Sequence, residues 1–304
     1  MNRRTVLEAG FRGDIGPAVA ASAASAQPAI AKRETRAPYA TAKDGTRLFV
    51  QDWGSGRQVL FLAAWTFNSD VWGSQIAALT AKGYRCIAPD RRGHGRSELP
   101  AMGYDLDTLA DDVAAVIEQR ELNDVTLVAH SMGAVEALGY LARHGSGRIS
   151  KLVLVAPTTP FLMKTEDNPD AIPEAMIEAQ IDAIARDFSK WMAENEAPFF
   201  MPDTNEVTRA WVRQMMLSVP QPVALACRRT IAGADLRAAA AKVDRPTLIV
   251  QGDKDASAPL PLTGAKTAKL IKGSKLTVYE GAPHALPLTH GERFNADLLA
   301  FLAA

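Results

Sequence analysis

The sequence lacks an excess of charge of either sign, because 34 Lys and Arg residues balance 34 Asp and Glu residues. It has no stripe of basic residues, so neither a nucleic acid nor an anionic membrane surface is expected as a partner. It also lacks any run of 18 uncharged apolar residues, which argues against a transmembrane helix. The 304 residues are enough to bury one large core, and a small-molecule substrate is the expected kind of partner.

Only two cysteines are present, Cys86 and Cys227, and they lie far apart in the sequence. They supply neither the spacing of a metal site nor a disulfide framework, so no metal is expected. Cys86 falls within a predicted core strand, where a cysteine serves as a small buried hydrophobe. The cysteines therefore give no indication of metal-dependent chemistry.

Residues 1–37 differ in composition from the rest of the chain. A pair of arginines near the start is followed by a Gly/Ala/Ser-rich stretch that ends before Gln27, which resembles a twin-arginine export leader. Arg12 and Asp14 interrupt the segment that such a leader keeps uncharged. The pattern predicts a periplasmic or secreted protein, and a disordered extension of a cytoplasmic protein is the alternative. Cleavage before Gln27 in a secreted fraction would distinguish the two.

Short apolar runs alternate with segments of helical period over 38–157 and again over 244–304. This rhythm predicts a parallel sheet with helices on both faces. Between the two parts, residues 158–243 show helical patterns only. Strands are predicted at 39–42, 46–52, 59–63, 85–89, 125–129, 151–156, 247–251 and 276–279. Helices are predicted at 71–81, 106–121, from 133 onward, 173–195, 206–218, 222–241, 260–271 and 293–302.

A serine stands between the fifth predicted strand and the helix that follows, in Ala129-His130-Ser131-Met132-Gly133. A chain that turns this sharply strains the serine backbone and requires small residues two positions before and after it, as Ala129 and Gly133 are. The segment resembles the nucleophile elbow of α/β-hydrolases, with alanine in place of the first glycine. The alternative is that Ser131 only caps the helix. The decision depends on whether a base and an acid follow.

A serine nucleophile needs a base, and the base needs an orienting acid. Gly252-Asp253-Lys254-Asp255 resembles the acid loop of α/β-hydrolases, which implies that Asp255 is the acid and Asp253 a turn residue. Gly281-Ala282-Pro283-His284 resembles their histidine loop, which implies that His284 is the base. His290 is the competing histidine, and its place before the last helix favours a packing role. The order of serine, acid and histidine is that of the family.

The resemblance also implies an oxyanion hole made of two backbone N–H groups. One belongs to Met132, the residue after the serine. The other belongs to the loop after the third strand, where the family has His-Gly and this chain has Ala63-Ala64. Trp65 then occupies the donor position and also forms a pocket wall. Ordinary core packing is the alternative for Trp65.

Within the superfamily, the chain resembles the cofactor-free haloperoxidase, aryl esterase and lactamase group, through these motifs and through Asp90-Arg91-Arg92-Gly93-His94-Gly95-Arg96-Ser97. The resemblance implies the α/β-hydrolase fold, with a mostly parallel eight-stranded sheet, and identifies 158–243 as a helical cap. It implies a cofactor-free serine hydrolase of small esters or lactones. Perhydrolase, amide, lactam or C–C bond chemistry at the same triad is the alternative. A non-catalytic binding protein would not need all three triad residues.

Substrate choice is expected to depend on the cap and on Trp65. Aromatic and methionine side chains in the cap are the candidate pocket walls: Phe188, Trp191, Met192, Phe199, Phe200, Trp211 and Met215. The alternative is that they bury the cap against the sheet. Their abundance favours an apolar acyl or aryl group. The sequence leaves open whether the protein forms a homo-oligomer.

Overall fold

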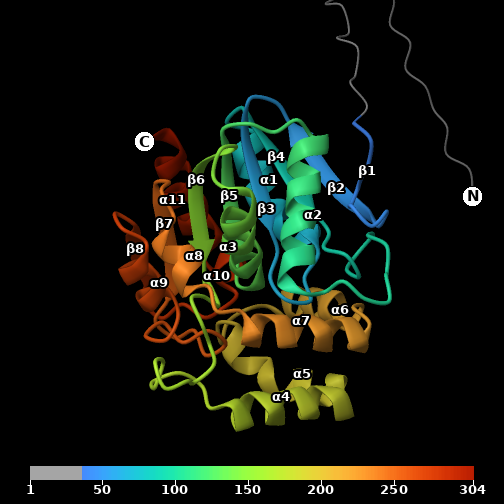
Figure 1. The fold of residues 1–304 in the computed structure, drawn as a ribbon, viewed down its shortest axis with the longest axis vertical. Coiled ribbons are helices and arrows are strands. Elements are labelled where there is room, and N and C mark those ends of the chain that lie inside the picture. The colour runs from blue at the N-terminus through green and yellow to red at the C-terminus, as the bar shows by residue number, and fades with distance from the viewer. Residues whose placement is uncertain (1–35) are drawn as a thin grey trace, which may run out of the picture. The chain divides into compact units, whose positions relative to one another are not determined.

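The computed structural model describes residues 36–304, so the predicted leader lies outside the described residues except for its last two. These residues form an eight-stranded sheet in the order β1-β2-β4-β3-β5-β6-β7-β8 (Figure 1). Strand β2 pairs antiparallel with β1 and β4, and the other pairs are parallel. The mostly parallel sheet expected from the sequence is confirmed. The strands are β1 (Tyr39–Thr41), β2 (Arg47–Gly54), β3 (Arg57–Leu62), β4 (Tyr84–Pro89), β5 (Val125–His130), β6 (Ile149–Val155), β7 (Thr247–Gly252) and β8 (Lys275–Tyr279).

Helices cover both faces of the sheet, which is why the central strands are mostly apolar and do not alternate between apolar and polar residues. Every residue of β5 and β7 is buried. Helices α2, α3, α8 and α9 pack in a row on one face, and α1 and α11 pack together on the other. The helices are η1 (Ser69–Trp72), α1 (Gly73–Thr80), α2 (Leu106–Gln119), α3 (Met132–His144), α4 (Glu174–Arg186), α5 (Phe188–Asn195), η2 (Ala197–Phe199), α6 (Glu206–Leu217), α7 (Gln221–Gly233), α8 (Arg237–Ala241), α9 (Gly264–Leu270), α10 (Leu286–Thr289) and α11 (Gly291–Ala303). Among the described helices, none has both the length and the apolar character needed to cross a membrane.

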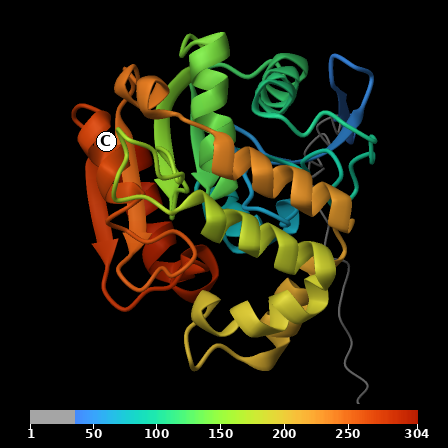
Figure 2. The same cartoon turned by 60° about the horizontal axis from the view of Figure 1, so that its bottom comes forward.

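The segment between β6 and β7 forms a helical cap made of α4 to α7. Figures 1 and 2 show these helices beyond the carboxyl ends of the strands, where open α/β sheets bind their ligands. Within the cap, α4 packs on α5 and α7, and α5 packs on α6. The two ends of the cap meet, because the backbone N–H of Leu236 donates to the carbonyl oxygen of Pro160 at 2.9 Å.

The structure corrects three expectations about the helices. The single helix predicted at 173–195 is two, because Asp187 leaves helical geometry (φ −158°) and caps α5 by accepting a hydrogen bond from the backbone N–H of Lys190. The helix predicted at 222–241 also divides, into α7 and α8. Helix α8 packs against α3 and α9, so the last part of the predicted cap, 158–243, belongs to the layer on the sheet.

Candidate active site

Ser131 lies at the sharp turn between β5 and α3. Its backbone has φ 55° and ψ −113°, a strained conformation for a residue with a side chain, and strain of this kind gathers at functional sites. The turn is tight enough that a Cβ atom on Gly133 would lie 2.5 Å from the carbonyl oxygen of Leu62. Only glycine fits there, which is the physical reason for the small residue that the sequence pattern requires.

The structure brings Ser131, His284 and Asp255 together from three separate loops. His284 Nε2 lies 2.9 Å from Ser131 Oγ, and His284 Nδ1 lies 2.8 Å from Asp255 Oδ2. All three side chains are buried. A proton on Nδ1 satisfies both contacts, because Nδ1–H then donates to the carboxylate and Nε2 is free to accept from the serine hydroxyl. The arrangement can therefore transfer a proton from Ser131 to His284.

The carboxylate of Asp255 is held by hydrogen bonds on both oxygens. Its Oδ1 accepts from the backbone N–H groups of Ser257 at 3.0 Å and Ala258 at 2.8 Å. Its Oδ2 accepts from the side-chain amide of Gln251 at 3.3 Å, in addition to the histidine. Gln251 was not singled out in the sequence, although it lies near the end of a buried strand, four residues before the acid. These contacts fix the direction in which the carboxylate faces His284.

Asp253 has a separate contact, with the loop that carries the histidine. Its Oδ1 accepts a hydrogen bond from the backbone N–H of Gly281 at 2.7 Å. The expected bond to backbone is thus present, but it joins the two loops instead of closing a local turn. This contact sets the spacing between the acid loop and the histidine loop.

The other histidines have distinct surroundings. His130 is buried beside the site, and its Nε2 contacts the carbonyl oxygen of His284 at 3.0 Å. Burial, together with repulsion from His284, lowers the pKa of His130 well below its ordinary value. His94 is buried in the loop after β4, where its Nδ1 contacts the carbonyl oxygen of Arg92 at 2.9 Å. His290 precedes α11 and packs against Tyr279, in agreement with the expected packing role.

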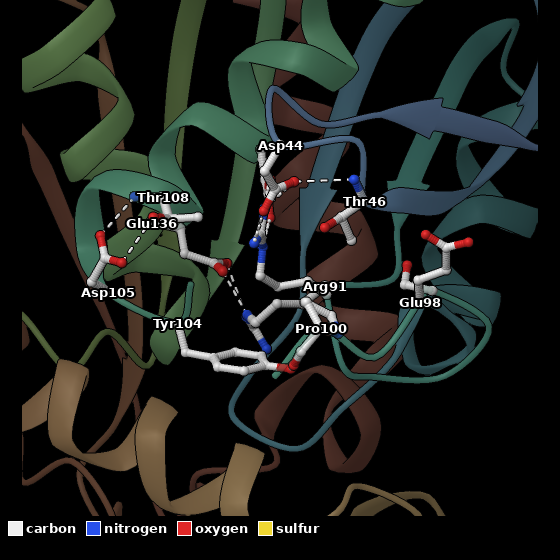
Figure 3. Close-up of polar contacts among 12 residues, drawn as sticks. Asp44, Thr46, Arg91, Glu98, Pro100, Tyr104, Asp105, Thr108 and Glu136 are labelled. Carbon is white, nitrogen blue, oxygen red and sulfur yellow. Dashed lines mark hydrogen bonds and ion pairs between the residues drawn. The ribbon is translucent and has the colours of Figure 1, made fainter. Parts of the chain in front are cut away.

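The loop after β3 is held by Arg91, which also forms a buried ion pair with Glu136. Figure 3 shows the ion pair. Arg91 donates to Glu136 at 2.5 and 2.9 Å, and also to the carbonyl oxygens of Ala63 at 2.7 Å and Ala64 at 3.2 Å. Burial opposes the charge of Arg91, but attraction to Glu136 outweighs it and raises the pKa of Arg91. The loop that departs from the family's His-Gly sequence is therefore fixed from outside by a side chain of the Asp-Arg-Arg-Gly-His-Gly segment.

Trp65 follows those two alanines and faces the cap. Its indole N–H donates to the carbonyl oxygen of Ala224 in α7 at 2.8 Å, and its ring packs on Phe188 and Trp191 of α5. The backbone N–H of Trp65 donates to no described residue. Met132 is the first residue of α3, and its backbone N–H has no partner within the helix.

Ser131 and His284 open onto a cavity of about 470 Å³ between the sheet and the cap, lined mostly by apolar side chains. Trp65, Trp191 and Phe199 line it, as do Met192 and Phe200. Phe188 and Trp211, also predicted to bind substrate, do not. Phe188 is buried behind Trp65 and Trp191, and Trp211 lies at the surface on the outer side of α6. Met215, a further candidate, is buried in the core.

Among residues 36–304, no cluster of His, Cys, Asp or Glu side chains is arranged to hold a metal ion. Cys86 and Cys227 are both buried and unpaired. Burial raises the pKa of each thiol to about 12, so neither is a nucleophile at neutral pH.

Comparison with protein families gives a match to the alpha/beta hydrolase family over residues 59–297. The chain belongs to the α/β-hydrolase family. This hydrolase is 39% identical over 274 residues to a non-heme chloroperoxidase of Kitasatospora aureofaciens, covering 87% of this chain and 99% of the relative. It is 35% identical over 276 residues to a bifunctional esterase/perhydrolase of Acinetobacter calcoaceticus, with 87% and 99% covered.

Solved structures support the same placement of this α/β-hydrolase. An esterase from Exiguobacterium antarcticum matches with a TM-score of 0.85 and 31% identity, covering 88% of this chain and 100% of the esterase. A bromoperoxidase from Bacillus anthracis matches with a TM-score of 0.83 and 33% identity, covering 88% and 100%. The predicted resemblance to haloperoxidases and esterases is therefore confirmed.

Proposed function

We propose that this α/β-hydrolase cleaves small carboxylic esters or lactones through an acyl-enzyme intermediate. The observation that carries the proposal is the chain of contacts from Ser131 through His284 to Asp255, at the wall of a mostly apolar cavity. The names of the relatives, which include an esterase and an esterase/perhydrolase, support the reaction class.

In the proposed mechanism, Ser131 Oγ attacks the carbonyl carbon while His284 Nε2 takes its proton. Asp255 holds Nδ1 and stabilises the imidazolium that forms. The backbone N–H groups of Met132 and Trp65 receive the negative charge on the substrate oxygen, and the loss of one such donor typically costs about 10²–10³ in turnover. His284 then protonates the leaving alcohol, and water releases the acid by the reverse sequence of proton transfers. A lactone follows the same steps, with the alcohol remaining attached to the acyl chain.

The test is hydrolysis of a panel of nitrophenyl acyl esters by the wild type and by Ser131→Ala. We expect turnover to fall by about 10⁴-fold or more, because the nucleophile is lost. Equal turnover would overturn the proposal. Asp255→Asn and Asp253→Asn form a matched pair, since both carboxylates lie in one loop and only Asp255 contacts the histidine. Asp255→Asn is expected to lose about 10⁴-fold in kcat, and a larger loss in Asp253→Asn would reassign the acid.

A second candidate function, perhydrolysis, is favoured by the chloroperoxidase and the esterase/perhydrolase among the relatives. Hydrogen peroxide takes the place of water in the second step, so the acyl group leaves Ser131 as a peracid and the serine regains its proton. The peracid then oxidises a halide in solution. Bromination that needs both acetate and peroxide, and that disappears in Ser131→Ala, would support this activity. Bromination that persists in that variant would exclude this route.

A further inference from the structure

Arg228 of α7 lines the cavity without an acidic partner. Its Nε and Nη2 donate to Oε1 of Gln180 in α4 at 2.8 and 2.5 Å. Its Nη1 makes no hydrogen bond to any described residue, and no carboxylate of residues 36–304 lies within ion-pair distance of it. A guanidinium held among apolar side chains without a counter-charge is costly, and proteins generally pair such groups.

The other charged side chains of the cavity are already neutralised. Glu196 and Arg213 also line it, and they form two hydrogen bonds of 2.8 Å with each other. Burial lowers the pKa of Arg228 to about 10, so the guanidinium still carries its charge at neutral pH. The cavity therefore has one unbalanced positive charge in addition to the Ser131–His284–Asp255 chain.

Gln180 provides a second donor beside the guanidinium. Its Oε1 is occupied by Arg228, which leaves its side-chain NH₂ group without a partner among the described residues. A carboxylate has two oxygens that accept from such neighbouring donors, and its single charge balances that of Arg228. A phosphate monoester would add nearly two negative charges at pH 7. The observations thus favour a carboxylate over a phosphate.

We propose that Arg228 and Gln180 form a subsite for a free carboxylate on the substrate, so that the preferred substrates are esters or lactones that carry a second, ionised carboxyl group in the acyl or alcohol part. The proposal rests on the hydrolase function of Ser131, because both sites share one cavity. In the reaction, water cleaves the ester bond through the acyl-enzyme while the second carboxylate stays intact and bound to Arg228.

The experiment compares the hydrolysis of each charged ester with that of a neutral ester of similar shape. Hydrolysis is measured by titrating the acid that is released. Monomethyl adipate is paired with methyl hexanoate, and acetoxybutyrate with butyl acetate, which separates a carboxylate in the acyl part from one in the alcohol part. The measured quantity is kcat/KM for the charged ester divided by kcat/KM for its neutral partner. We expect Arg228→Met to lower this ratio by about 10- to 100-fold for at least one pair, mainly because KM for the charged ester rises. Arg228→Lys, which keeps the charge, is expected to retain more of the ratio.

Arg229→Met is the matched control, because Arg229 follows Arg228 in α7 but is exposed and pairs with Glu178. It is expected to keep the wild-type ratios. The ratio is measured within each variant, so partial loss of folded protein does not change it. Ratios in Arg228→Met equal to those of the wild type would overturn the subsite, even if all the esters are hydrolysed. A wild type that hydrolyses nitrophenyl esters but neither charged ester would also overturn the subsite, whereas a wild type that hydrolyses no ester of either kind would refute the proposed function.

Discussion

Replacing Glu136 by glutamine is expected to destabilise the protein by about 3 kcal/mol, the lower end of the cost of breaking a buried ion pair. The side chains of Arg91 and Glu136 are only 4% and 6% exposed, so solvent does not compensate for the lost charge. Glutamine keeps one acceptor oxygen for the guanidinium, which places the loss at the lower end. A change of this size is a large part of the 5–15 kcal/mol typical of a folded domain.

The double variant Arg91→Met/Glu136→Leu separates stability from loop positioning. Replacing a buried pair by apolar side chains of similar volume is often neutral for stability, so this variant is expected to unfold near the wild-type denaturant concentration. However, the carbonyl oxygen of Ala63 loses its Arg91 donor, and that of Ala64 keeps only the backbone N–H of Phe67. The neighbouring Trp65 N–H is then free to shift, and a displacement of about 1 Å typically costs 10²-fold in rate.

Stability is measured by urea unfolding, with tryptophan fluorescence as the signal. Activity is measured as kcat for a nitrophenyl ester. We expect Glu136→Gln to lower stability strongly, and the double variant to recover stability while kcat stays about 10²-fold below the wild type. A double variant with wild-type kcat would show that the pair serves stability alone. A loss below 1 kcal/mol in Glu136→Gln would refute the reasoning about buried charge.

Two further predictions concern the elbow and a buried histidine. Gly133→Ala should lower the free energy of unfolding by about 1–3 kcal/mol, because the added methyl group meets the backbone of Leu62. Gly139→Ala is the control and should lower it far less, because its methyl group meets the flexible end of the Leu106 side chain. Equal melting temperatures of the two variants would contradict this prediction. Burial, aided by Arg91, lowers the pKa of His94 to about 3, so below pH 6.5 the unfolded chain binds a proton that the folded protein does not. Between pH 6.5 and about 3, stability should therefore fall by up to about 1.4 kcal/mol for each pH unit. If the stability of His94→Gln falls with pH as steeply as that of the wild type, His94 is not the cause.

The sequence was sufficient to predict the sheet because most of its strands are short apolar runs bounded by loop residues. The elbow, the acid loop and the histidine loop were also visible, since each lies in one continuous segment. Contacts between distant segments were not visible. Arg228 and Gln180 come from different cap helices, and nothing in the sequence around either residue shows that they meet over the cavity. The break at Asp187 did have a local signal, an N-capping residue, which the regular spacing of the isoleucines in α4 concealed.

The hydrogen bond between Leu236 and Pro160 joins the two ends of the cap, so the cap could be exchanged as a unit. The chain leaves the core for the cap near Pro160 and returns to it near Leu236, and these two points are in contact. Loops whose two ends lie side by side are the places where insertions and replacements are tolerated best. The crossover from β6 to β7 needs only α8, which remains on the sheet. The loops that carry Ser131, Asp255 and His284 come from the core, so replacing the cap with that of a related enzyme should change the substrate preference and leave these three residues in place. Arg228, carried on the cap, would leave with it.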